Sequence, residues 1–170
     1  MVLLFSDKPC TSSPILVIGY GNPLRSDDGI GPQIAETLES WHLPQVQTIA
    51  VHQLTPELAA LLVQFDGVIF VDASLHRNSQ TIPQISIEPI QFASFPDSPP
   101  SSLIGHLSDP RSLLTLTQAL YHQVPQAWWM MVPGVNFEVG DQLSGIGKQN
   151  VDIALHQLTH FIQTVRTEEA

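Results

Sequence analysis

The sequence predicts an α/β fold, a three-layer α/β/α sandwich around a mostly parallel, twisted central sheet of about five strands. Short apolar runs alternate along the chain with segments whose apolar residues recur every three or four positions. Two of the runs, ILVIG and GVIFV, contain no polar residue, which is typical of parallel strands covered by helices on both faces. Because strands and helices alternate, we expect βαβ units with right-handed crossovers.

The first half of the chain supplies three of these strands. Residues 15–19 form the first, and a turn-rich loop, GYGNPLRSDDG, follows it. A helix is expected over residues 30–41, where the apolar side chains share one face, and a second strand over 48–52. A Thr-Pro pair typical of a helix start then precedes a helix over 57–65 and the third strand at 67–72.

The second half continues the alternation. Residues 84–90 alternate apolar with polar side chains, which indicates a half-exposed or edge strand. A Pro/Ser-rich loop occupies 91–102, and an Asp-Pro pair begins a helix over 109–122. The last buried strand is expected at 128–132, and an apolar stripe predicts a final helix over 151–165.

Composition indicates one domain over residues 1–170, with 1–13 as a flexible N-terminal segment. Six Lys and Arg face sixteen Asp and Glu, a formal net charge of -10, so nucleic acid and anionic membranes are excluded as partners. A lone cysteine, Cys10, allows neither an internal disulfide nor a Cys-based zinc site and favours a cytoplasmic location. No apolar run approaches the ~18–20 residues of a membrane span, and we expect a monomer.

The candidate functional residues follow the strands, because sites in such sheets collect at the carboxyl ends of strands. Asp27 and Asp28 follow the first strand, Asp72 ends the third, and His106 precedes the Asp-Pro helix start. The alternatives are ordinary ones: either acid of the pair could cap the next helix, and Asp72 could form a turn.

Two carboxylates and an imidazole suit an open site for a divalent first-row metal, which could activate water or be carried by another molecule. A paired-carboxylate acid/base mechanism, as in aspartic peptidases, is an alternative. A dinucleotide site is disfavoured because Leu24 stands where the third glycine of GxGxxG belongs, and His52 stands where an acid is expected. There is also no GxSxG motif. The helix histidines His156 and His160 are interpreted as surface residues.

The segment ILVIGYGNPLRSDDGIGPQIAETL closely resembles the amino-terminal signature of the hydrogenase maturation endopeptidases. The resemblance extends to GVIFVDAS, GHLSDP and GVNFEVGDQLS and covers roughly residues 14–165. It implies a peptidase that removes the C-terminal extension of a nickel–iron hydrogenase large-subunit precursor after nickel insertion.

In that family three residues contact the nickel of the substrate, and by resemblance these are Asp28, Asp72 and His106. The nickel arrives with the precursor, so no tightly bound metal is expected in the resting protein. Asp28, or its neighbour Asp27, would be the general base towards water. The Pro/Ser-rich segment 91–105 would form a mobile lid before His106.

The chain departs from the family pattern at two places. Asp28 stands where glutamate is frequent, and Gly134-Val135-Asn136-Phe137 replaces the frequent Gly-x-(Gln/Glu)-Pro, which leaves the choice of substrate open. Two other functions stay open: a different metal-dependent α/β hydrolase, and a maturation chaperone that binds the precursor without cutting it.

Overall fold

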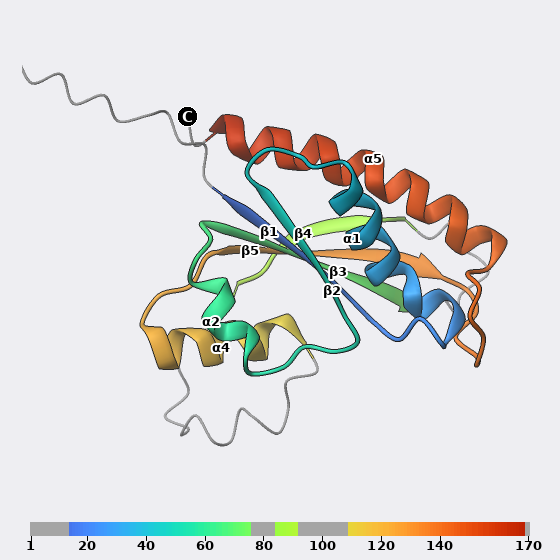
Figure 1. The fold of residues 1–170 in the computed structure, drawn as a ribbon, viewed down its shortest axis with the longest axis horizontal. Helices are drawn as coiled ribbons and strands as arrows, with labels where there is room; N and C mark the ends of the chain where they lie inside the picture. Colours follow the sequence, from blue (N-terminus) through green and yellow to red (C-terminus); the bar gives the residue numbers. More distant parts are fainter. Residues whose placement is uncertain (1–13, 76–83, 92–108, 169–170) are drawn as a thin grey trace, which may run out of the picture.

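The computed structural model describes residues 14–75, 84–91 and 109–168, which form a five-stranded sheet between two helical layers (Figure 1). The strands are β1 (Ile15–Tyr20), β2 (Val46–Val51), β3 (Gly67–Leu75), β4 (Ser86–Pro89) and β5 (Gln126–Gly134). The helices are η1 (Ser26–Gly29, a 3₁₀ turn), α1 (Ile30–Ser40), α2 (Leu58–Leu62), α4 (Pro110–Tyr121) and α5 (Gly145–Glu168).

The strand order is β2-β1-β3-β5-β4, and every pairing is parallel except that of β4, which runs antiparallel to β5 at the edge. The predicted fold class, a mostly parallel sheet of about five strands, is therefore confirmed. So is the edge position predicted for residues 84–90, since β4 lies within that range. β1 and β3 are buried on both faces along the apolar runs that predicted them.

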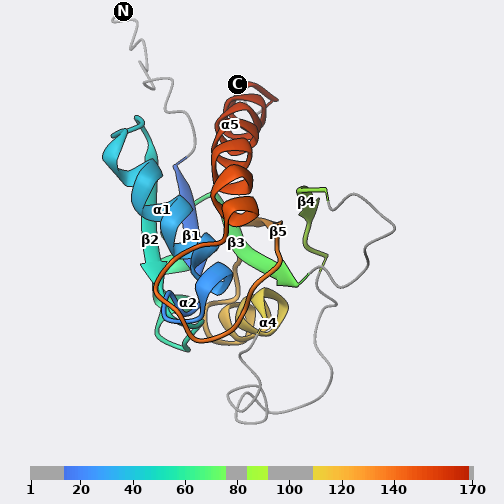
Figure 2. The same ribbon diagram turned by 90° about the vertical axis from the view of Figure 1, so that its right-hand side faces the viewer.

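Helices α1 and α5 cover one face of the sheet, and α2 and α4 cover the other (Figure 2). Alternate residues of each strand enter the two cores, as the two-residue period of a strand requires. On β3, Ile69 and Val71 pack towards α1 and α5, whereas Val68 and Phe70 pack towards α2 and α4. Both cores are closed without help from a disulfide.

Helix α1 lies against β1 at a crossing that depends on glycine. A Cβ atom on Gly19 would lie 2.0 Å from the carbonyl oxygen of Gly31, and one on Gly31 would lie 2.5 Å from the carbonyl oxygens of Tyr20 and Val71. The backbones touch there, so the start of α1 is pressed directly onto the carboxyl ends of β1 and β3. This contact places the η1 turn beside those ends.

Three sequence predictions lie outside the described residues. These are the flexible segment 1–13, nearly all of the lid at 91–105, and His106. Among the residues that the structure does describe, no helix is both long and apolar enough to cross a membrane.

Candidate functional site

The candidate site lies at the carboxyl edge of the sheet, where β1 and β3 end. Figure 1 shows the arrowheads of β3 and β5 ending beside the chain that leads into α1. Asp28 comes from η1, the first element after β1, and Asp72 lies on β3. The two acids are close enough for the charge of Asp28 to raise the pKa of Asp72. The parallel sheet thus brings together two of the three predicted nickel contacts.

Asp72 is half-buried and holds its proton more tightly than an ordinary aspartate. Burial is the largest cause of the change, and hydrogen bonds from Tyr20 and the Ala73 backbone oppose it, while the charge of Asp28 adds to it. The net effect raises the pKa of Asp72 to about 6. Because the two carboxylates lie together in a partly desolvated place, a cation between them would offset both the desolvation of the ionised Asp72 and its repulsion by Asp28.

Tyr20, the last residue of β1, orients Asp72. Its hydroxyl donates a hydrogen bond to Asp72 Oδ2 over 2.8 Å. Burial, and then the charge of Asp72, raises the pKa of Tyr20 well above its ordinary value, so the hydroxyl remains a donor at neutral pH. The buried indole nitrogen of Trp129 has no hydrogen-bond partner in the described structure but lies near enough to offset part of that rise.

Tyr20 was not among the site residues predicted from the sequence. A signal was present: a residue with a polar tip ends an otherwise apolar strand, one residue beyond the predicted strand end. Tyr20 and Asp72 face the α2 and α4 layer, because each continues the two-residue spacing of side chains buried there, Leu16 and Ile18 on β1 and Val68 and Phe70 on β3.

Asp28 holds the loop between β1 and η1 in shape. Its Oδ2 atom accepts a hydrogen bond from the backbone N–H of Asn22 over 2.9 Å. Neither η1 nor α1 has a side-chain cap at its N-terminus, so the helix-capping alternative for Asp27 and Asp28 is wrong. Gly21, which precedes Asn22, has a φ of 141° and its Cβ would lie 2.0 Å from the Asp28 carbonyl oxygen, so the turn requires glycine.

Asp27 is fully buried, and both oxygens of its carboxylate accept hydrogen bonds. Oδ2 accepts hydrogen bonds from the backbone N–H groups of Val135 (2.8 Å) and Asn136 (3.0 Å) and from the Ser144 hydroxyl (2.8 Å). Oδ1 accepts from the Ser144 N–H over 2.7 Å. Burial pushes the pKa of Asp27 upwards, but the hydrogen bonds from Val135, Asn136 and Ser144 outweigh it and lower the pKa.

These bonds tie the first loop to the connection between β5 and α5. A Cβ on Gly147 would lie 2.3 Å from Asp27 Oδ1, so the chain also closes over the second oxygen. A carboxylate with this many donors and no exposure is poorly suited to take a proton from a substrate water. The geometry favours Asp28 over Asp27 as the general base and gives Asp27 a structural role.

The third predicted contact, His106, is not described, but the start of α4 is. Asp109 caps this helix by accepting a hydrogen bond from the Ser112 N–H over 3.1 Å, and its charge contributes to the raised pKa of Tyr20. Helix α4 therefore begins within electrostatic range of the Tyr20–Asp72 pair. His106 precedes Asp109 by three residues, which span at most ~10 Å. Within the described part of the chain, no three His, Cys, Asp or Glu residues are grouped as a metal site.

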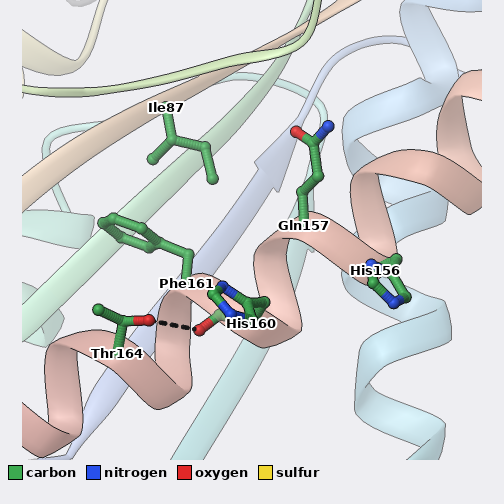
Figure 3. A pocket seen from close by; sticks show the side chains of 6 residues that line it. All are labelled: Ile87, His156, Gln157, His160, Phe161 and Thr164. Carbon is green, nitrogen blue, oxygen red and sulfur yellow. Dashed lines mark hydrogen bonds between the residues drawn. The ribbon is translucent and has the colours of Figure 1, made fainter.

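A separate hollow on α5 and β4 has no part in this site (Figure 3). It has a volume of about 390 Å³ and is lined by Ile87, His156, Gln157, His160, Phe161 and Thr164. His156 and His160 are exposed, in agreement with their interpretation as surface residues. The hollow contains neither Asp28 nor Asp72.

Solved structures with the same fold include several hydrogenase maturation proteases. The protease HycI from Thermococcus kodakarensis KOD1 has a TM-score of 0.66 and 17% identity, over 90% of this chain and 95% of that one. The hydrogenase 2 maturation peptidase from Thaumarchaeota archaeon SCGC_AB-539-E09 has a TM-score of 0.65 and 20% identity, over 88% of this chain and 98% of that one. The maturating endopeptidase HybD from E. coli has a TM-score of 0.65 and 21% identity, over 89% of this chain and 93% of that one.

No protein-family model matches the chain, and no curated protein is found as its relative. The similarity to the solved structures therefore establishes the fold: this chain has the architecture of the hydrogenase maturation proteases over nearly its whole length.

Proposed function

We propose that the protein is a hydrogenase maturation endopeptidase, which removes the C-terminal extension of a nickel–iron hydrogenase large-subunit precursor once nickel has been inserted. The observation that carries the proposal is the pair of acids, Asp28 and Asp72, at the carboxyl edge of a sheet shared with proteases of that name. Asp28, Asp72 and His106 would contact the substrate's nickel, and no metal of the protein's own is required.

The acid pair explains how cleavage could depend on nickel. Without a cation, burial and the charge of Asp28 disfavour the ionised form of Asp72, so the pair adds nothing to precursor binding. A nickel ion carried by the precursor makes both carboxylates attractive contacts. Carboxylate and imidazole ligands suit such a divalent ion, and His106 precedes by three residues Asp109, whose charge acts on Tyr20.

Asp28 is the better base for the hydrolytic step. A water held between Asp28 and the scissile carbonyl would attack the carbon while its proton passes to the carboxylate, which then returns a proton to the leaving amine. Asp72, held by Tyr20, would serve as a nickel contact. One Asp28 oxygen is already fixed by the Asn22 N–H, which orients the other.

Few cations and a single cysteine also support a cytoplasmic location and exclude nucleic acid as a partner. We include a monomeric state in the proposal.

The test is a mass-spectrometric cleavage assay with nickel-loaded and nickel-free large-subunit precursor. Wild-type protein should shorten only the loaded precursor, and Asp28→Ala, Asp72→Ala and His106→Ala should each reduce the rate at least a hundredfold. Asp152→Ala, which removes an exposed acid of α5, is the matched control and should cut normally. Binding without any change of mass would instead identify a chaperone, and stoichiometric metal in the purified protein would identify a different metal-dependent hydrolase.

A further inference from the structure

Several exposed apolar side chains lie at the edge of the sheet that carries the candidate site. The described residues include nine large hydrophobic side chains that are exposed, and five of them lie at the carboxyl edge of the sheet or on the loops beside it. We call these five the carboxyl-edge patch: Leu24 (61% exposed), Leu75 (44%), Val135 (43%), Val139 (93%) and Ile146 (47%). Single exposed apolar residues are ordinary, but a concentration at one place marks an interaction surface.

Along the chain, each member of the patch lies within four residues of Asp28, of Asp72 or of a residue that binds Asp27. Leu24 lies on the loop that leads to Asp28, and Leu75 ends β3 beyond Asp72. Leu75 pairs in register with Gly134, the residue before Val135. Ile146 lies in the first turn of α5, two residues after Ser144, which binds Asp27. The patch therefore lies on the loops and element ends at the same edge of the sheet as the acid pair.

Backbone hydrogen bonds hold part of the patch in place. A parallel bridge joins Arg25 to Gly140, through bonds from the Gly140 N–H to the Leu24 carbonyl (2.9 Å) and from the Ser26 N–H to the Gly140 carbonyl (2.9 Å). Leu24 and Val139, each one residue before the bridge, therefore lie on neighbouring stretches of backbone in the two loops.

The two loops are also tied together by side chains. Arg25 Nη2 donates to the Phe137 carbonyl over 3.2 Å, and the buried carboxylate of Asp27 binds the N–H groups of Val135 and Asn136. These bonds fix the backbone of both loops next to Leu24 and Val139, and a backbone held in this way preorganises the surface for a partner.

We propose that the carboxyl-edge patch is the docking surface for the folded large-subunit precursor, in contact with apolar surface around its nickel site. The inference rests on the proposed function and adds to it. Contacts to nickel can distinguish loaded from unloaded precursor, but they do not fix the scissile bond against Asp28. Docking through the patch supplies that orientation, and it contributes binding energy whether or not nickel is present.

This independence from nickel makes the inference testable. Binding of wild-type protein to nickel-free and nickel-loaded precursor is measured by biolayer interferometry, with cleavage of the loaded form followed by mass spectrometry. We expect Val139→Asp and Ile146→Asp each to raise the Kd for both forms roughly tenfold, the change expected when burial of one aliphatic side chain is lost. KM should rise similarly with kcat nearly unchanged.

The matched control is Ile153→Asp, which changes the same residue type on the same helix at nearly the same exposure, 49% against 47% for Ile146. Ile153 lies two turns further along α5, so its substitution should leave both Kd values unchanged. Asp72→Ala should weaken binding of the loaded precursor only. Val139 is 93% exposed, so its substitution leaves the core intact.

Several results would overturn the inference. If Val139→Asp and Ile146→Asp bind and cut as wild type does, while Asp72→Ala abolishes cleavage, the patch has no docking role and the proposed function survives. If size-exclusion chromatography shows a wild-type dimer that Val139→Asp converts to a monomer, the occupant is a second copy of the chain. If wild-type protein neither binds nor cuts either precursor, the proposed function fails and the docking role with it.

Discussion

At the scale of single residues, the site depends on two hydrogen-bonded carboxylates with opposite shifts of pKa. Asp72 shares a partly buried place with another acid and is harder to ionise, whereas Asp27 is surrounded by donors and is easier to ionise. Strand β3 thus provides a carboxylate for chemistry, whereas the carboxylate of Asp27 in η1 has a structural role. The difference lies in the number of N–H and O–H groups that reach each side chain.

Tyr20→Phe should weaken cleavage by removing the hydrogen bond to Asp72 without changing the shape of the core. Because that bond lowers the pKa of Asp72, its loss should raise the pKa further. We expect kcat/KM for loaded precursor to fall about tenfold near pH 6.5, less at pH 8, and the acid limb of the pH profile to move upwards. Tyr121→Phe, at an exposed tyrosine, is the control. Superimposable wild-type and Tyr20→Phe profiles would contradict this role.

Asp27→Asn should destabilise the protein by about 2–4 kcal/mol at pH 7, because an amide turns one acceptor into a donor facing N–H groups already in place. Since the folded-state pKa of Asp27 is lowered, its stabilisation is present above the unfolded pKa, near 3.8, and is lost as pH falls through the folded value. The cost of the substitution should therefore shrink below about pH 4. Urea unfolding at pH 7 and pH 3 measures the loss of unfolding free energy, with Asp152→Asn as the control. An equal loss at both pH values would contradict the lowered pKa of Asp27 in the folded state.

At the scale of helices and strands, the packing of α1 on β1 and β3 leaves no room for a side chain at the point of contact. Gly31 lies where the start of α1 meets the ends of β1 and β3, and its missing side chain allows carbonyl oxygens of both strands to approach. The site inherits its geometry from this contact, because Tyr20 ends β1 and Asp72 follows Val71 on β3.

Gly31→Ala should therefore cost at least about 2 kcal/mol, although alanine is intrinsically the better helix former by ~1 kcal/mol. The added methyl would meet backbone atoms of Tyr20 and Val71, which cannot move aside as a flexible side chain would. Gly145→Ala is the control, since a Cβ there meets nothing within 4 Å. Thermal unfolding distinguishes the two, and equal melting temperatures would mean that α1 shifts freely against the sheet.

The elements that sequence analysis placed well are those defined by long apolar runs. β1, β3 and β5 carry such runs, and α1 and α4 carry a clear apolar face. Their ends were less predictable, because ends depend on partners. β3 continues to Leu75 through pairing with β5, and α5 begins at Gly145, six residues before the apolar stripe, where Ser144 is held by Asp27. Helix α2 covers only five residues of the nine predicted.

The site was predictable in part for the same reason. Asp28 and Asp72 were found because they follow buried strands, and parallel strands end at one edge. The role of Asp27 was not evident, since its donors come from residues 135–144, more than a hundred positions away. Tyr20 and the carboxyl-edge patch likewise depend on contacts between distant segments, which local sequence patterns do not encode.

For the whole molecule, the two shifted carboxylates predict where the protein is most stable. The pKa of Asp72 is about 6 in the folded state, whereas it is near 3.8 in the unfolded chain. Between these values the folded state binds more protons, so stability falls as pH rises from about 4 to 6 and stays lower above that. The net charge of -10 at pH 7 adds self-repulsion in the same direction. The ionised carboxylate of Asp27 adds to the free energy of unfolding above its unfolded pKa, near 3.8, and this contribution is lost at lower pH. Stability should therefore be greatest near pH 4.

Asp72→Asn tests this expectation, because it keeps the size of the side chain and removes the charge. It should raise the free energy of unfolding by about 1–3 kcal/mol at pH 7.5, as follows from ~1.4 kcal/mol per pKa unit, and by little at pH 4, while abolishing cleavage of loaded precursor. Denaturant unfolding at both pH values measures the difference, with Asp152→Asn as the control. If the unfolding free energies of Asp72→Asn and wild type differed equally at both pH values, the charge of Asp72 would have no effect on the stability of the resting protein. The expected result would show that the ionised carboxylate of Asp72 lowers the stability of the resting protein, a cost that a cation bound between Asp28 and Asp72 would offset.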